Sequence, residues 1–212
     1  KIGSVRFRWT REIPATFQNV TVSRDVLGWH VSFSAEIKIN AVRNLMPAVG
    51  IDRGVVHALA LSDGTFIDAP RASLKKLDAR ARRHARQVAR CRRGSNRHRK
   101  AKARLAATKA ETARVRRHFN HVASARIASS YGVVVIEALQ VKNMTASASG
   151  TVHNPGSNVR QKAGLNRSIL DMGWSQFATF LTYKLVAAGG ELRTIAPQHT
   201  STTCSCCGVI DK

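Results

Sequence analysis

The chain has 212 residues, of which 43% are hydrophobic, so it can bury the core of one large domain or two small ones. Its 35 lysines and arginines far exceed its 12 acidic residues, and the formal net charge of +23 points to nucleic acid as the partner. No run approaches the roughly 18 apolar residues of a membrane span, and no signal peptide opens the sequence. We therefore expect a cytoplasmic protein with no membrane partner.

The first elements of the sequence predict a β-hairpin. From Trp29 to Ile39, apolar residues alternate with mostly polar ones, which is the pattern of a half-buried strand. Val20 and Val22 precede the turn-like residues 25–28 and predict the partner strand.

Three short apolar runs come next, at residues 48–51, 55–61 and 66–67. Gly54 and the turn dipeptide at 63–64 separate them, so this part predicts a three-stranded meander.

Residues 71–117 are strongly basic, with apolar positions at helical spacing on both sides of a break at 94–96. This pattern predicts a basic helical hairpin, inserted over residues 71–130. Cations of one sign on a helix repel one another unless a polyanion lies against them, which favours a nucleic-acid surface over a merely solvated face. The candidate nucleic-acid-binding residues are Lys75, Lys76, Arg82, Arg83, Arg86, Arg90, Arg92, Arg93, Arg97, Arg99, Lys100, Lys102 and Arg104.

The remaining third of the chain alternates strand and helix patterns. Four β-branched residues at 133–136 predict a strand buried on both faces, and the polar residues 145–168 predict a flexible loop. A helix with one apolar stripe, Leu170, Trp174, Phe177, Leu181 and Leu185, is expected to end at the glycines 189–190. A short strand is expected at 192–195.

Two carboxylates stand out because each belongs to a strand of the predicted core. Asp52 lies in the apolar segment 48–52, and Glu137 follows the strand at 133–136. Burying a lone carboxylate is costly unless it is paired or bound to metal. Adjacent strands could bring both acids onto a pair of Mg²⁺ or Mn²⁺ ions about 4 Å apart, the arrangement that hydrolyses phosphodiesters. Taken singly, either acid could instead cap a helix or a turn.

Cys204 and Cys207 have the C-x₂-C-G spacing of a zinc knuckle. A structural zinc ion takes four ligands, so we expect Zn²⁺ here only if a second cysteine pair is supplied beyond Lys212. Cys206 and His199 are less favoured substitutes. We accordingly expect the chain to be part of a longer protein.

These residues together resemble the TnpB (OrfB) family of transposon-encoded, RNA-guided nucleases, which are related to type V CRISPR effectors. The similar segments are Gly50-Ile51-Asp52-x-Gly54, Val135-Ile136-Glu137-x-Leu139, Gly173-Trp174-x-x-Phe177 and Thr203-Cys204-x-x-Cys207-Gly208. Ordered blocks of this kind cover nearly the whole chain.

The resemblance implies an α/β architecture: an RNase H-like (RuvC-like) nuclease fold over residues 47–212, preceded by the end of a β-barrel wedge domain over residues 1–46. It also implies that Asp52 and Glu137 bind Mg²⁺ and that residues 199–212 form the first half of a zinc ribbon. The partners would be a guide RNA and target DNA, in the nucleoid of a prokaryote. The oligomeric state is not implied.

The resemblance also implies a third metal-binding carboxylate beyond Lys212, so we expect the isolated chain to be inactive. The alternatives are a non-cleaving nucleic-acid-binding relative, a strand-joining transposase or its accessory protein, and a basic structural protein. The basic structural protein would explain the net charge of +23 but leaves Asp52, Glu137 and the cysteines without a role.

Overall fold

The computed structural model describes residues 4, 6–8, 12–13 and 16–197, and the chain divides into two compact units. One unit combines residues 1–40 with 75–112, and the other combines 41–74 with 113–212. No helix in the described part of the chain is long and apolar enough to span a membrane.

The first unit contains the predicted β-hairpin. Strand β1 (Asn19–Asp25) pairs antiparallel with β2 (Gly28–Ser34), and the backbone N–H of Leu27 donates to the Asp25 carboxylate at 2.7 Å within the turn. The hairpin is therefore confirmed, but the strand predicted to reach Ile39 ends at Ser34. Residues 35–39 belong to no described strand, and Ile39 is 51% exposed. The wedge domain of residues 1–46 stays a prediction.

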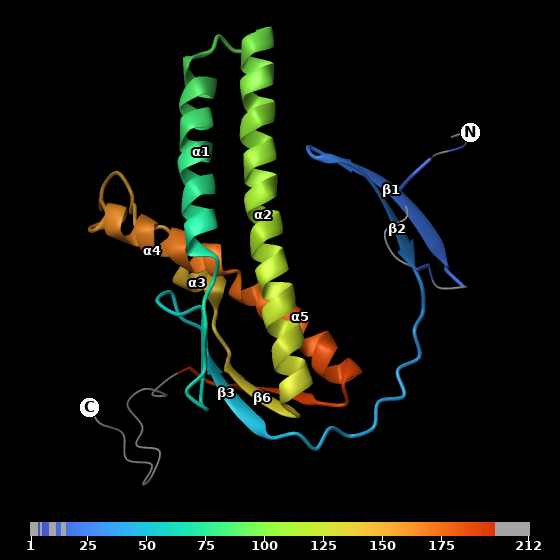
Figure 1. The fold of residues 1–212 in the computed structure, drawn as a ribbon. Coiled ribbons are helices and arrows are strands. Elements are labelled where there is room, and N and C mark those ends of the chain that lie inside the picture. The colour runs from blue at the N-terminus through green and yellow to red at the C-terminus, as the bar shows by residue number, and fades with distance from the viewer. Residues whose placement is uncertain (1–3, 5, 9–11, 14–15, 198–212) are drawn as a thin grey trace. The chain divides into compact units, whose positions relative to one another are not determined.

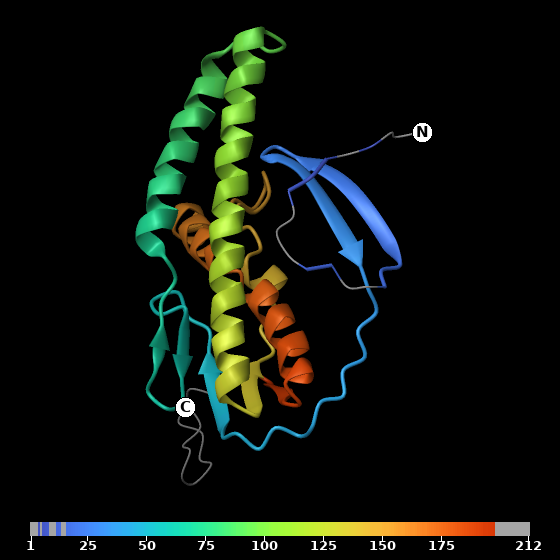
Figure 2. The same ribbon diagram turned by 45° about the vertical axis from the view of Figure 1, so that its right-hand side comes forward.

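The basic segment forms the predicted helical hairpin. Helix α1 (Arg71–Arg90) and helix α2 (Asn96–Ser130) lie side by side and are joined by a turn in which Gly94 has a φ of 79° (Figures 1 and 2). Leu77 and Ala101 are buried, and an ion pair joins Arg80 of α1 to Glu111 of α2.

The second unit is built on a mixed five-stranded sheet, as expected for an α/β protein. Its strands are β3 (Ala48–Asp52), β4 (Leu59–Leu61), β5 (Phe66–Ile67), β6 (Val133–Glu137) and β7 (Glu191–Ile195), in the order β5-β4-β3-β6-β7. β3, β4 and β5 form the predicted antiparallel meander, whereas β6 runs parallel to β3 and to β7.

Helices cover one face of this sheet. They are the carboxyl-terminal part of α2, the short α3 (Val141–Met144), α4 (Val159–Met172) and α5 (Trp174–Ala187). Figure 2 shows the end of α2 and all of α5 beside β6. The core joins Ile51 and Val134 of the sheet to Ile127 of α2 and to Phe177 and Leu181 of α5.

The expectation that β6 is buried on both faces is wrong. Val134 and Ile136 are buried, but Val133 and Val135 are only partly buried. The run of β-branched residues is consistent with the position of β6 inside the sheet, between β3 and β7. Only one of the two faces of β6 packs against the helices.

Two predictions about the segment from 145 to 189 also need correction. Helix α4 begins at Val159, so the loop predicted to reach residue 168 is shorter. The helix predicted through Leu170 is interrupted at Gly173, which has a φ of 65°. Because α4 ends there, Leu170 is 54% exposed, and Ile169 and Met172 are buried instead. Glycine adopts this left-handed backbone conformation with little steric strain, because it has no Cβ.

Candidate metal centre

Asp52 and Glu137 end two neighbouring parallel strands. The β3–β6 register pairs Gly50 with Val135 and Ile51 with Ile136, and one further step places Asp52 beside Glu137. Neighbouring strands lie about 4.8 Å apart, so the two acidic residues are adjacent at the same edge of the sheet. The structure thus brings together the two carboxylates singled out in the sequence, although they are separated by the meander and the basic helices.

The exposure of the two carboxylates differs from the expectation of burial. Asp52 is exposed and Glu137 is partly buried. Side chains alternate along a strand, so Asp52 lies on the face opposite the buried Ile51, and Glu137 likewise lies opposite Ile136. Both carboxylates are therefore on the sheet face away from the helix-covered core.

A third charged group, Arg53, completes the arrangement and was missed in the sequence. It follows the last residue of β3 and is only 6% exposed, and its side chain reaches the start of α5 on the covered side of the sheet. Its Nη2 donates to the backbone carbonyl of Glu137, and its Nη1 lies 3.5 Å from the carbonyl oxygen of Trp174. A charged residue next to Asp52 within an apolar strand pattern is the one signal that could have drawn attention to it.

Burial governs the electrostatics of Arg53. Desolvation lowers the pKa of its guanidinium, while the negative charges of Glu137 and then Asp52 act in the opposite direction. The centre therefore combines two carboxylates on one face of the sheet with a buried cation on the other.

The donor set fits a hard divalent cation. Mg²⁺ prefers oxygen ligands and is commonly held by one or two carboxylates, with waters and substrate phosphates completing its shell. Asp52 and Glu137 would supply two such ligands. Within the described residues, no cluster of three or more histidine, cysteine or acidic side chains could hold a metal. Cys204 and Cys207 lie outside the described residues, so the zinc site stays a prediction.

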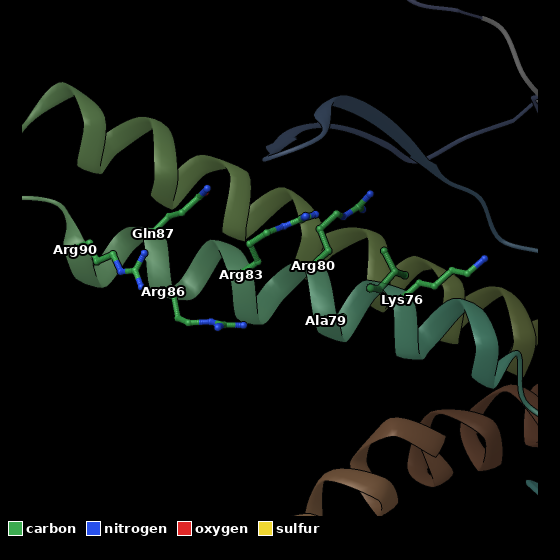
Figure 3. Close-up of a pocket in the computed structure, with 8 residues that line it drawn as sticks. Lys76, Ala79, Arg80, Arg83, Arg86, Gln87 and Arg90 are labelled. Atoms are coloured by element: carbon green, nitrogen blue, oxygen red, sulfur yellow. The ribbon is translucent and has the colours of Figure 1, made fainter.

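The basic surface predicted on the helical hairpin is accessible. Every one of the candidate nucleic-acid-binding residues from Lys75 to Arg104 is exposed. A hollow of about 630 Å³ along α1 is lined by basic side chains from successive turns, including Lys76, Arg83, Arg86 and Arg90 (Figure 3). Such a row of cations suits a phosphate backbone rather than base edges.

Two known families match separate parts of the chain. OrfB_IS605, described as "Probable transposase", matches residues 30–148. A second family, described as "Cas12f1-like, TNB domain", matches residues 174–212.

Two curated relatives extend the similarity over nearly the whole chain. A protein of Escherichia coli (strain K12) named "Putative RNA-guided DNA endonuclease InsQ" is 37% identical over 209 residues, which is 98% of this chain and 52% of that protein. A Streptomyces pristinaespiralis protein named "Putative RNA-guided DNA endonuclease" is 32% identical over 207 residues, 96% of this chain and 48% of the relative. The chain therefore spans about half the length of these relatives.

The fold is similar to that of a solved protein. A chain in the cryo-EM structure of a CRISPR-Cas12f ternary complex matches with a TM-score of 0.50 and 21% identity, over 90% of this chain and 37% of that one. At this identity the likeness concerns the fold alone.

Proposed function

This chain belongs to the OrfB_IS605 family, and from that premise we propose that it forms the RuvC-like, metal-dependent nuclease part of an RNA-guided DNA endonuclease. The observation that carries the proposal is the register of β3 and β6, which sets Asp52 next to Glu137. The names of the two curated relatives support the same activity.

Asp52 and Glu137 would hold Mg²⁺ or Mn²⁺ against a scissile phosphate of DNA. When bound, the metal would activate water and stabilise the charge that develops on the leaving oxygen. The protein's own contribution is to keep both carboxylates in place on one sheet edge. Among the described residues, only the carboxylates of Asp52 and Glu137 are proposed as ligands of this metal, and no cluster of three possible ligands is found. We therefore propose that cleavage also requires metal ligands from outside the described residues. Zn²⁺ at Cys204 and Cys207 belongs to the same proposal and would stabilise the region after β7.

The basic hairpin would bind the guide RNA and the target DNA through their phosphates. In RNA-guided recognition, base pairing reads the sequence, and the protein reads backbone and shape. The exposed lysines and arginines of α1 and α2 suit this division of labour, because on these helices they far outnumber the acidic residues Asp78 and Glu111.

The test is cleavage of plasmid DNA by the full-length protein with its co-purified RNA and Mg²⁺. We expect Asp52→Asn and Glu137→Gln each to reduce the cleavage rate by about a thousandfold or more, since metal catalysis contributes several kcal/mol to the barrier reduction. Binding of RNA and DNA should remain within about threefold of wild type, because phosphate contacts dominate affinity.

Asp68→Asn is the matched control. Asp68 is also an exposed aspartate that follows a strand of the sheet, but its carboxylate pairs with His57 at 3.0 Å, beyond the far edge strand β5. It should cleave like wild type. If Asp52→Asn cleaves DNA at the wild-type rate, or if the wild type binds nucleic acid without cutting it, the non-cleaving binding protein becomes the correct function.

A further inference from the structure

Arg53 connects the backbones of the two acidic residues. It is covalently next to Asp52, and its guanidinium donates to the carbonyl oxygen of Glu137 itself. The backbone pairing of β3 with β6 extends only to Ile51 and Ile136. The Arg53 side chain therefore supplies a hydrogen bond between the two strands just beyond the end of their ladder, at the position of the carboxylates.

The same guanidinium lies close to a third element. Its Nη1 is 3.5 Å from the carbonyl oxygen of Trp174, the first residue of α5. Arg53 can thus restrain the ends of β3 and β6 and the start of α5 together. A planar, rigid guanidinium suits this task better than a flexible ammonium group.

Stability alone does not account for a charge at this place. A buried cation carries a desolvation cost, and replacing buried charges by apolar side chains of similar volume is often neutral or stabilising. The Nε of Arg53 is buried without a hydrogen-bond partner among the described residues, which adds to that cost. Its positive charge also opposes binding of a metal cation nearby, so the benefit of Arg53 must come from geometry.

We infer that Arg53 is a positioning residue for the metal centre, which holds the ends of β3 and β6 at the separation at which Asp52 and Glu137 bind one divalent cation. The inference rests on the proposed function, because it requires these two carboxylates to be metal ligands. Arg53 itself touches neither the metal nor the substrate. It acts from the covered face of the sheet through the backbone of Glu137.

The experiment measures Mn²⁺ binding to the RNA-free full-length protein by electron paramagnetic resonance, with cleavage as a second readout. Arg53→Met keeps the volume of the side chain and removes its charge and its hydrogen bonds. We expect it to raise the Mn²⁺ dissociation constant about tenfold or more, as is typical when a residue supporting metal ligands is lost. The circular dichroism spectrum and the melting temperature should remain close to wild type.

Arg71→Met is the matched control. Arg71 also donates from Nη2 to backbone carbonyls, those of Val55 and Val56, but it is exposed and lies outside the centre. It should bind Mn²⁺ within about twofold of wild type, because it supports no metal ligand.

The sign of the effect separates geometry from charge. If Arg53 acts only through its charge, Arg53→Met removes a repelling cation and binds Mn²⁺ more tightly, and tighter or unchanged binding overturns the inference. Should Arg53→Met fail to fold, Arg53→Lys provides the test, because lysine keeps the positive charge but lacks the planar guanidinium that reaches two carbonyl oxygens. Weaker binding by folded Arg53→Lys supports positioning, and wild-type affinity overturns it.

The Asp52→Asn variant distinguishes a failure of the positioning role of Arg53 from a failure of the proposed function on which it rests. If Asp52→Asn binds Mn²⁺ as the wild type does, the proposed metal centre fails, and the role of Arg53 fails with it. If Asp52→Asn loses the ion while Arg53→Met retains it, only the role of Arg53 is wrong.

Discussion

Gly189 lies directly against the backbone carbonyl of Val42, at a distance where any Cβ on residue 189 would overlap the oxygen. The backbone N–H of Asn44 donates to the Gly189 carbonyl at 2.9 Å, and the N–H of Gly132 donates to the carbonyl of Pro47 at 3.0 Å. The segment that leads into β3 is thus attached to the glycine turns that precede β6 and β7. These contacts fix the start of β3, β6 and β7, and the opposite ends of β3 and β6 carry Asp52 and Glu137.

Gly189→Ala should therefore destabilise the protein. Gly189 has a φ of 71°, which alanine adopts only with strain, and the new Cβ must also displace the Val42 backbone. We expect the free energy of unfolding to fall by about 2 kcal/mol or more. Urea unfolding monitored by circular dichroism measures the change.

Substitutions at two other glycines distinguish the cost of backbone strain from the cost of steric overlap with a new Cβ. Gly64 has a φ of 84° but open space around its Cβ position, so Gly64→Ala should cost only about 1 kcal/mol. Gly164, inside α4, also has open space, and Gly164→Ala should stabilise the helix by about 0.5 to 1 kcal/mol. Equal effects at all three positions would contradict the close approach at Gly189.

Local patterns predicted most of the elements. The alternation around Trp29, the Asp63-Gly64 turn and the basic helices depend on neighbours in the sequence. The turn and the helices have the expected form, whereas the strand that contains Trp29 is shorter than expected and ends at Ser34. The interruption at Gly173 was missed because it depends on distant groups. The Nδ2 of Asn120 in α2 lies 2.8 Å from the position of a Cβ on Gly173 and 3.3 Å from its carbonyl oxygen. A hydrophobic stripe carries no information about such a contact.

The candidate site likewise has features that the local sequence predicts and features that depend on distant contacts. Asp52 and Glu137 could be singled out because each interrupts or ends an apolar strand pattern, a property of the local sequence. That they are neighbours depends on the parallel pairing of β3 with β6 across the intervening helices. Arg53 was missed because arginine is ordinarily exposed, and only the helical cover of the sheet explains its burial. Short-range patterns therefore predict candidate ligands better than the residues that support them.

Tyr131→Phe should change how stability depends on pH. The Tyr131 hydroxyl donates to the Asp63 carboxylate, and this hydrogen bond, followed by that from the Thr65 N–H, lowers the pKa of Asp63. A carboxyl group whose pKa is lowered by folding stabilises the protein above its unfolded pKa, near about 4, and loses this contribution as the pH falls through the folded pKa. Tyr131→Phe should thus be less stable than wild type at neutral pH, with a smaller difference in acid.

Urea unfolding at neutral and acidic pH tests this, with Tyr183→Phe as the control. Tyr183 is another partly exposed tyrosine, but its ring contacts His121 and Phe180, and no carboxylate partner is found in the described structure. Its substitution should give a stability difference that does not shrink toward acid. A Tyr131→Phe difference that is constant over the same range would show that the hydrogen bond to Asp63 does not matter for stability.

Arg83→Ala should weaken nucleic-acid binding in a salt-dependent way. Arg83 is exposed and lines the hollow along α1. An arginine that contacts a phosphate releases a counterion, so its loss should reduce the slope of log K against log salt by about 0.9 for duplex DNA. Affinity for unrelated sequences should fall by the same factor, because phosphate contacts carry no sequence information.

Arg82→Ala provides the comparison, since Arg82 neighbours Arg83 in the sequence and is also exposed. Its Nη2 lies 2.5 Å from the Asp78 carboxylate one helical turn away, whereas Arg83 makes no ion pair within the described residues. Because Asp78 already neutralises Arg82, we expect Arg82→Ala to change the slope less. Fluorescence anisotropy on a short duplex between about 50 and 200 mM salt resolves slopes of this size. Equal slopes for the two variants would mean that Asp78 releases Arg82 on binding, and that the hollow along α1 has no special part in holding phosphate.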